Sequence, residues 1–96
     1  MDEFRDALTR HRWEHVAGFD YPKFASHSFE ADPQPVIDAF RSLAERHRLT
    51  FGKTGDVQIR SRANAIVSFR ANSDGGRRFF VELKALFEPP RKSHPE

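Results

Sequence analysis

The chain contains no cysteine, which excludes disulfide bonds, thiolate metal sites and cysteine nucleophiles. It also has no apolar run near the roughly 18 residues that a membrane-spanning helix needs. Its N-terminus is acidic and then mixed, unlike a signal peptide. Neither an internal repeat nor a low-complexity tract occurs in the sequence. We therefore expect a cytoplasmic protein with no membrane partner.

A chain of 96 residues is enough for one domain with one modest core. Ten Phe residues carry much of the apolar content. A deep enzyme cavity is hard to build at this size, so we expect a non-enzymatic binding domain without a cofactor. Residues 88–96 contain no apolar side chain for a core. This predicts a single domain over 1–87 and a flexible tail over 88–96.

Positive charge is concentrated in the second half of the chain. Residues 1–48 contain seven Lys or Arg and nine Asp or Glu, for a net charge of −2. Residues 49–96 contain nine and five, for a net charge of +4. Twelve of the sixteen cations are Arg, the side chain best suited to planar anions and to stacking. The second half is therefore the better place to look for an anionic partner.

Two segments have the apolar spacing of helices. The first covers residues 3–17, where Asp2 can cap the helix and Gly18 can end it. The second follows Asp32, a natural N-cap, with Pro33 in the first helical position. The apolar stripe of this second helix consists of Val36, Ile37, Phe40, Leu43, Ala44 and His47.

Strands are predicted in the rest of the chain. Residues 24–31 form a weak strand candidate after an aromatic loop at 18–23. In segments 57–60, 65–71 and 79–87, the odd positions are apolar and most even positions are polar, which is strand periodicity. The expected fold is therefore α+β, with two helices on one face of an antiparallel sheet of about four strands, in the order α-β-α-β-β-β.

Pairing odd positions with odd positions gives a register for the last strands. A hairpin loop at 72–76 places Arg70 opposite Arg78. A tight turn between the two preceding strands places Ile59 opposite Val67. The even-numbered side chains of all three strands then share the outer face of the sheet.

This outer sheet face is the best functional candidate. The face and its edges carry six cations and one aromatic ring: Arg60, Arg62, Arg70, Arg77, Arg78, Lys84 and Phe80. Cations can hold phosphates while an exposed ring stacks on a base, so the face predicts binding of single-stranded nucleic acid or RNA. The RNP1 motif of RNA-recognition domains is absent. A face that strand Arg and Lys simply keep soluble stays open as an interpretation.

A protein partner is the alternative. Ile66, Phe80 and Leu86 are apolar residues on the predicted outer face, and Trp13 and Val16 lie off the main stripe of the first helix. Exposed apolar patches usually mark contacts with other proteins. The sequence therefore also predicts a protein-interaction or regulatory subunit, including a homodimer, with no role in nucleic-acid binding.

His11, Glu14 and His15 spell H-x-x-E-H, which resembles the inverted zinc-protease signature. On a helix, the two His would share a face and could bind zinc, with Glu14 as base. The resemblance covers five residues, and neither a downstream acidic ligand nor a fold large enough to bury substrate is evident. We therefore assign no catalytic or metal-binding residue, and we keep a metal site completed by His27 or His47 as a further hypothesis.

Three other groups of polar residues carry weaker signals. Gly52-Lys53-Thr54-Gly55 lacks the spacing of a phosphate-binding loop, so a β-turn is predicted there. Ser26 and His27 are neighbours in a predicted strand and point to opposite faces, so they cannot form a nucleophile–base pair. The carboxylates near the first strand lie in no identifiable cleft; they are Asp20, Glu30 and Asp32.

Overall fold

A computed structural model describes residues 2–28, 31–60 and 65–88. Within these ranges the chain forms three helices and four strands. Their bounds, in chain order, are α1 (Asp2–Arg10), β1 (Trp13–His15), β2 (Lys23–Ser26), α2 (Gln34–Arg46), β3 (Val57–Ile59), β4 (Ile66–Ala71) and α3 (Asp74–Phe87). None of the described helices is both long enough and apolar enough to cross a lipid bilayer.

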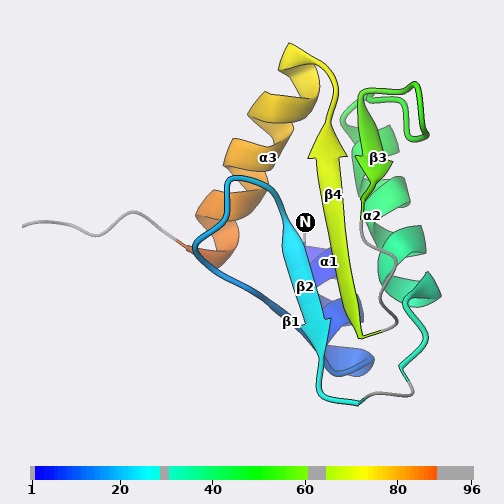
Figure 1. Ribbon diagram of the computed structural model, residues 1–96, viewed down its shortest axis with the longest axis vertical. Coiled ribbons are helices and arrows are strands. Elements are labelled where there is room, and N and C mark those ends of the chain that lie inside the picture. The colour runs from blue at the N-terminus through cyan, green and yellow to red at the C-terminus, as the bar shows by residue number, and fades with distance from the viewer. Residues whose placement is uncertain (1, 29–30, 61–64, 89–96) are drawn as a thin grey trace, which may run out of the picture.

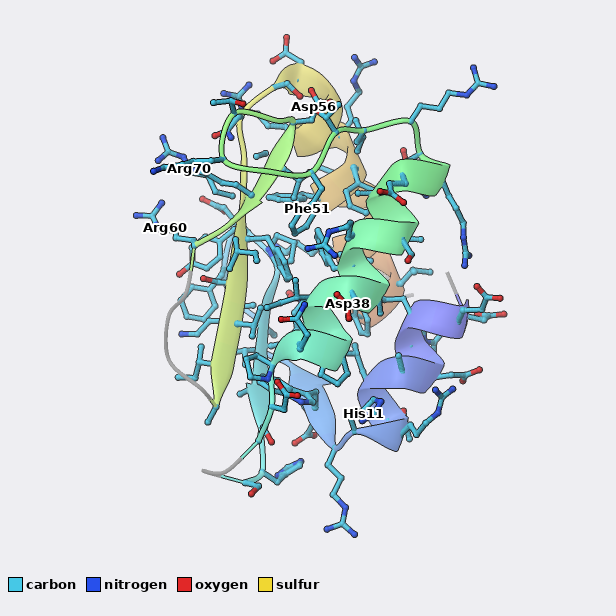
Figure 2. All side chains as sticks on the ribbon, turned by 90° about the vertical axis from the view of Figure 1, so that its right-hand side faces the viewer. His11, Asp38, Phe51, Asp56, Arg60 and Arg70 are labelled. Carbon is cyan, nitrogen blue, oxygen red and sulfur yellow. The ribbon has the colours of Figure 1, made fainter. Side chains whose placement is uncertain are left out.

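The strands form one sheet in the order β1-β2-β4-β3, and every pair of neighbours is antiparallel. The helices lie on one side of this sheet and leave the other side open (Figure 1, Figure 2). The α+β class, the four-stranded antiparallel sheet and the two-layer arrangement are therefore confirmed. The helical layer contains three helices rather than the predicted two, and β2 is shorter than the strand predicted over 24–31.

The first helix is also shorter than predicted. α1 ends at Arg10 rather than near residue 17. Arg12 then takes a left-handed backbone conformation, with φ +60°, which redirects the chain into β1. Trp13, predicted to lie off the core-facing stripe, is 3% exposed and belongs to the core. Gly18, predicted to end the helix, lies in the loop between β1 and β2 with φ +93°.

The helix predicted after Asp32 is present as α2, but its N-cap is Pro33 rather than the predicted Asp32, and its first helical residue is Gln34 rather than Pro33. The Asp32 carboxylate accepts a hydrogen bond from the N–H of Gln34 at 3.0 Å, which satisfies one free donor at the helix start. The buried residues of α2 are Val36, Ile37, Phe40, Leu43 and Ala44. These are the residues of the predicted stripe except for His47. His47 is exposed, and its ring contacts the ring of Phe79 in a tilted arrangement.

The predicted alternation of inward and outward side chains is present only in part in β3 and β4. Val57, Val67 and Phe69 are buried and Arg70 is exposed, as predicted. Ile59 is 38% exposed and Ser68 only 7% exposed, which is the reverse of the prediction at these two positions. The predicted register is wrong by two residues, because Ile59 lies opposite Phe69 and not opposite Val67. A shift of two residues keeps each side chain on the same face. The outer face predicted from β3 and β4 therefore survives the correction.

The largest correction concerns the end of the chain. The sequence pattern predicts a strand over 79–87, but the chain forms α3. Phe80 is buried and Val81 is 68% exposed, which is the reverse of the predicted strand parity. The predicted hairpin and its Arg70–Arg78 pair across the sheet are therefore wrong.

Ser73 is the reason that a helix begins here. Its backbone is extended, with φ −144°, and its Oγ accepts a hydrogen bond from the N–H of Gly76 at 3.0 Å. This is the geometry of an N-cap residue. Asp74 follows in the first turn, where the helix dipole favours a negative charge.

Ser73 also joins α3 to the loop that precedes β3. The Asp56 carboxylate accepts hydrogen bonds from the backbone N–H of Thr50 at 2.9 Å and from its hydroxyl at 3.0 Å. Hydrogen bonds hold the pKa of Asp56 below its usual value. The bond from the Ser73 hydroxyl has the largest effect, and the two bonds from Thr50 follow.

The β-turn predicted at 52–55 is confirmed by a bond from the N–H of Gly55 to the carbonyl of Gly52 at 3.1 Å.

Gly76 tests this junction. A Cβ on Gly76 would lie 2.5 Å from the carbonyl oxygen of Asp56. A Cβ on Gly75 would lie 3.2 Å from the end of the flexible Leu49 side chain and 3.8 Å from Oγ of Ser73, an ordinary contact distance. We expect Gly76→Ala to lower the free energy of unfolding by about 1–3 kcal/mol, because backbone must move to make room. The matched variant Gly75→Ala should stay within about 0.5 kcal/mol of the parent. Denaturant unfolding measures both, and equal effects would contradict the close approach.

Candidate nucleic-acid interface

Two arginines project from the open face of the sheet. Arg70 lies on β4 opposite Gln58 of β3. Arg60 extends the same ladder, because its N–H donates to the carbonyl of Ser68 at 2.8 Å. In an antiparallel pair, this register puts Arg60 and Arg70 on one face. Figure 2 shows both side chains pointing away from the helical layer.

Arg60 and Arg70 stand between two hollows. The first, of about 210 Å³, is called the arginine hollow; it is lined by Asp20, Tyr21, Arg60, Phe69, Arg70, Ala71, Arg77 and Phe80. The second is an open depression of about 440 Å³ on the β3 side, lined by Phe51, Gly52, Lys53, Gln58, Ile59, Arg60 and Arg70. Both arginines are therefore positioned to contact a ligand in either hollow.

The positive charge of this region is largely unneutralised. Neither Arg60 nor Arg70 takes part in any ion pair between residues that the structure describes. Arg77 pairs with Asp74 at 2.8 Å, but on an exposed surface, where such a pair contributes little. Of the described residues that line the arginine hollow, Asp20 alone is acidic. Free guanidinium groups around a shallow concavity are suited to binding phosphates or carboxylates.

Aromatic side chains adjoin the arginines through the loop at residues 16–22, which joins β1 to β2. The rings of Phe19 and Tyr21 are in contact, with centroids 5.3 Å apart. The Lys23 ammonium lies 4.3 Å from the centroid of Phe19. The carbonyl of Pro22 accepts a hydrogen bond from the N–H of Phe69 at 3.1 Å, which ties this loop to β4. Cations and partly buried aromatic rings therefore lie next to each other, with Tyr21 also packed against the core.

Three of the seven predicted site residues line the arginine hollow as surface cations: Arg60, Arg70 and Arg77. Phe80 is 5% exposed and packs in the core, so its predicted role as a stacking surface is wrong. Arg78 is an exposed residue of α3, Lys84 lines a different pocket, and Arg62 lies outside the described residues.

Four residues of this region were not among the sequence candidates for binding: Phe19, Asp20, Tyr21 and Lys23. They belong to the segment at 18–23 that composition marks only as an aromatic loop. Their contact with β4 depends on the long-range pairing of β2 with β4. The sequence signal for this loop is a pair of aromatic residues between Gly18 and Pro22. Glycine permits a tight turn and proline restricts the backbone, so the two residues together favour a short, ordered loop.

The H-x-x-E-H string does not lie on a helix. α1 ends before it, so His11 lies in a turn and His15 ends β1. Glu14 pairs with His27, with 2.5 Å between its Oε2 and Nε2 of the histidine. Within the described residues no group of three or more His, Asp or Glu could hold a metal ion. His11 and His15 therefore do not share a helix face, which the zinc-protease arrangement would require.

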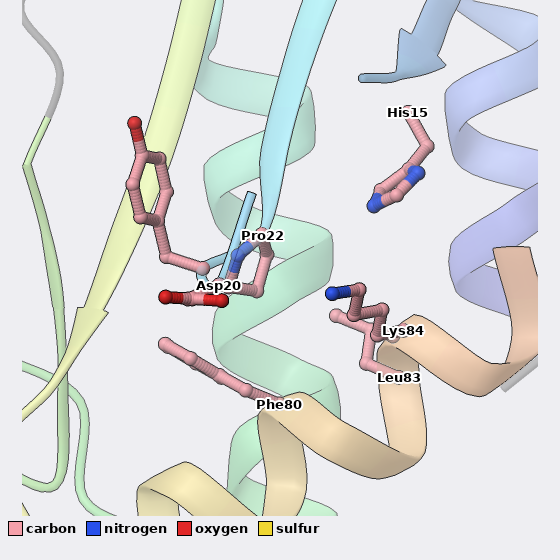
Figure 3. A pocket seen from close by; sticks show the side chains of 7 residues that line it. His15, Asp20, Pro22, Phe80, Leu83 and Lys84 are labelled. Carbon is pink, nitrogen blue, oxygen red and sulfur yellow. The ribbon is translucent and has the colours of Figure 1, made fainter. Parts of the chain in front are cut away.

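His15 occupies a partly buried position next to α3 (Figure 3). Its ring stacks on Phe87, with centroids 4.7 Å apart and planes 11° from parallel. Its Nε2 is 3.6 Å from Oε2 of Glu88, too far for a hydrogen bond. Burial lowers the pKa of His15, the Glu88 charge opposes this shift, and the Lys84 charge adds to it. The adjoining cavity of about 10 Å³ holds at most one water molecule, which is too small for a substrate.

The other polar groups take separate roles within the described residues. The Ser26 hydroxyl accepts a hydrogen bond from the N–H of Ser28 at 3.1 Å, while His27 is engaged by Glu14. Asp32 accepts a hydrogen bond from the N–H of Gln34 at the start of α2, and Glu30 lies outside the described residues.

Comparison of the chain with models of known protein families, with curated proteins and with solved structures finds no match. The open face of the sheet can bind anions through guanidinium groups and can present flat ring surface to a planar ligand.

His15 makes stability depend on pH. Because folding lowers its pKa below the ordinary value of 6.5, the folded state resists protonation and the unfolded state does not. We expect the free energy of unfolding to be highest above this value and to fall as the pH decreases below it. His15→Phe, which retains a ring against Phe87, should reduce this loss. Thermal unfolding from about pH 8 to about pH 5, which brackets the histidine range, measures the difference. Equal pH dependence in the parent, His15→Phe and His15→Leu would contradict the assignment.

Proposed function

We propose that this protein is a non-enzymatic domain that binds single-stranded nucleic acid, RNA above all, across the open face of its sheet. In this proposal, Arg60, Arg70 and Arg77 hold phosphates, and Tyr21 with Phe19 provides the surface on which bases stack. The proposal includes the cytoplasmic location expected from the sequence, where RNA is available to the domain.

The observation that carries the proposal is the unpaired state of Arg60 and Arg70 beside an aromatic loop. Arg60 faces Ser68 and Arg70 faces Gln58, so the two like charges lie diagonally across neighbouring strands and repel each other weakly. An anionic ligand removes this repulsion and gains charge-assisted hydrogen bonds. A strand of nucleic acid is an anion with flat bases, and binding grooves for it combine cations with stacking aromatics. Both features lie on this face within the described residues.

The choice of a single strand over a duplex rests on the shape of the face. Duplex readers insert a helix or a ribbon into a groove, whereas here the cations project from a sheet between shallow hollows. Bases can reach Tyr21 only when they are not stacked in a duplex. Loops and single strands present bases in this way.

Salt dependence tests the proposal. We expect a labelled oligouridylate to bind at low salt, with log Kd rising linearly with log salt concentration, because binding releases counterions. The double variant Arg60→Ala/Arg70→Ala should bind more weakly and should lose about 0.7 from the slope for each phosphate contact removed. Fluorescence anisotropy at several salt concentrations measures both quantities.

Arg10→Ala is the matched control, because Arg10 is an exposed arginine at the end of α1 in the helical layer. It removes the same charge from the other side of the molecule and should leave the salt slope nearly unchanged. The proposal is wrong if no binding occurs at low salt, or if the double variant keeps the parent's affinity and slope.

A protein partner is the second candidate. The observation that favours it is the exposure of Val81 and Leu86 on α3, at 68% and 37%. Exposed apolar residues on one helix can form a dimer contact. Sedimentation equilibrium at about ten micromolar, a concentration on the scale of ordinary affinities, distinguishes the states. A dimer that Val81→Lys converts to a monomer would support this candidate, and a strict monomer would remove its homodimer form.

A further inference from the structure

The arginine hollow contains one group that phosphate binding does not need, the Asp20 carboxylate. A carboxylate among three arginines repels phosphate, and it takes part in no ion pair between described residues. Arg77 does not require it as a counter-charge, because Arg77 already pairs with Asp74 at 2.8 Å. The two oxygens of Asp20 are therefore available as acceptors for a ligand.

The surroundings of Asp20 resemble a site for a flat ring. Buried Phe69 and Phe80, with half-buried Ala71, form an apolar lining to the hollow. Asp20 and Phe80 lie side by side, since both line the same two pockets and Figure 3 draws them together. Tyr21 is the next residue in the loop. The volume of about 210 Å³ admits one planar group rather than a length of chain.

The loop that carries Asp20 is anchored at both ends. Pro22 is buried, and its carbonyl accepts from the N–H of Phe69 at 3.1 Å. The loop starts from Val16, whose N–H donates to the carbonyl of Lys23 at 2.8 Å. The Asp20 side chain itself is exposed and within reach of a ligand. A carboxylate on an anchored loop can select a ligand by its pattern of donors, because less ordering of the backbone is required when the ligand binds.

A carboxylate accepts hydrogen bonds and donates none. Guanine presents two neighbouring donors on its Watson–Crick edge, N1–H and the 2-amino group, which match two carboxylate oxygens. Adenine and cytosine present one amino group beside an acceptor nitrogen, and uracil presents one N–H between two carbonyl groups. An acceptor that faces an acceptor is left unpaired, which costs free energy. Asp20 therefore favours guanine over the other three bases.

We propose that the arginine hollow selects a guanine base within a single strand. Asp20 accepts from N1–H and the 2-amino group, Tyr21 lies against the base, and Arg60 and Arg70 hold the adjoining phosphates. This inference rests on the proposed function and adds the base that the site prefers.

Base substitution in one probe tests the preference. The probes are labelled oligouridylates that carry one central guanosine, inosine, adenosine or cytidine, with the all-uridine strand as background. Inosine keeps N1–H and lacks the 2-amino group. We expect the guanosine probe to bind about tenfold more tightly than the adenosine and cytidine probes, as for one bidentate contact to a base. The inosine probe should lie between them.

Asp20→Asn tests the residue. It replaces one acceptor oxygen with a donor, so the affinity for the guanosine probe should fall to that for the all-uridine strand. The affinity for the all-uridine strand itself should stay constant or rise, because a negative charge has been removed. Asp38→Asn, which makes the same change on α2 in the helical layer (Figure 2), should leave the guanosine preference intact.

The outcomes separate this inference from the proposed function. If all probes bind equally to the parent with a normal salt slope, the base preference is wrong and nucleic-acid binding stands. If Asp20→Asn keeps the guanosine preference, another residue reads the base and the inference fails. If no probe shows salt-dependent binding, both proposals fail together.

Discussion

The ring of Phe40 lies flat on the ring of Phe69, with centroids 3.7 Å apart and planes 5° from parallel. This stack joins α2 to the central strand β4, and both residues are fully buried. Five other rings are arranged edge to face around Phe40; they are Phe4, Phe24, Phe51, Phe79 and Phe80. Edge-to-face geometry stabilises aromatic pairs beyond the area that they bury. Because one ring contacts α1, β2, β4 and α3, the helical layer and the sheet are held in a single arrangement. The orientation of β4, and therefore of Arg70 on its other face, depends on this cluster.

The class of the fold could be predicted from residue patterns, but the helix α3 could not. In β3 and β4 the alternation of apolar and polar residues identifies Val57, Val67 and Phe69 as buried, although Ile59 and Ser68 depart from it. In α3, the spacing of Phe79, Leu83 and Phe87 by four residues satisfies both strand and helix periods. Phe80 decides between them, since a helix buries it beside Phe79 and a strand exposes it. The N-cap at Ser73 was the local signal for the helix, but a loop of small polar residues also fits a hairpin.

The candidate site was predictable in part for the same reason. Arg60 and Arg70 share a face in any register that keeps odd positions opposite odd positions, so a register error of two residues did no harm. The aromatic half of the site could not be predicted in this way. Tyr21 lines the arginine hollow together with residues of β4, and Phe19 contacts Tyr21. This placement depends on the pairing of β2 with β4 across a long stretch of chain, which no short-range pattern encodes. Lys84 and Phe80 do not lie on the predicted sheet face, because their segment is helical.

The hydrogen bond between the Pro22 carbonyl and the amide of Phe69 has a consequence for how the surface comes into existence. The aromatic loop and the segments that carry the arginines are distant in sequence. They come together only when the two central strands, β2 and β4, pair. A nascent or partly unfolded chain has each half of the surface but not their combination. Any ligand that needs both halves therefore recognises only the complete native state, and its presence in the cell would shift the folding equilibrium towards that state by mass action.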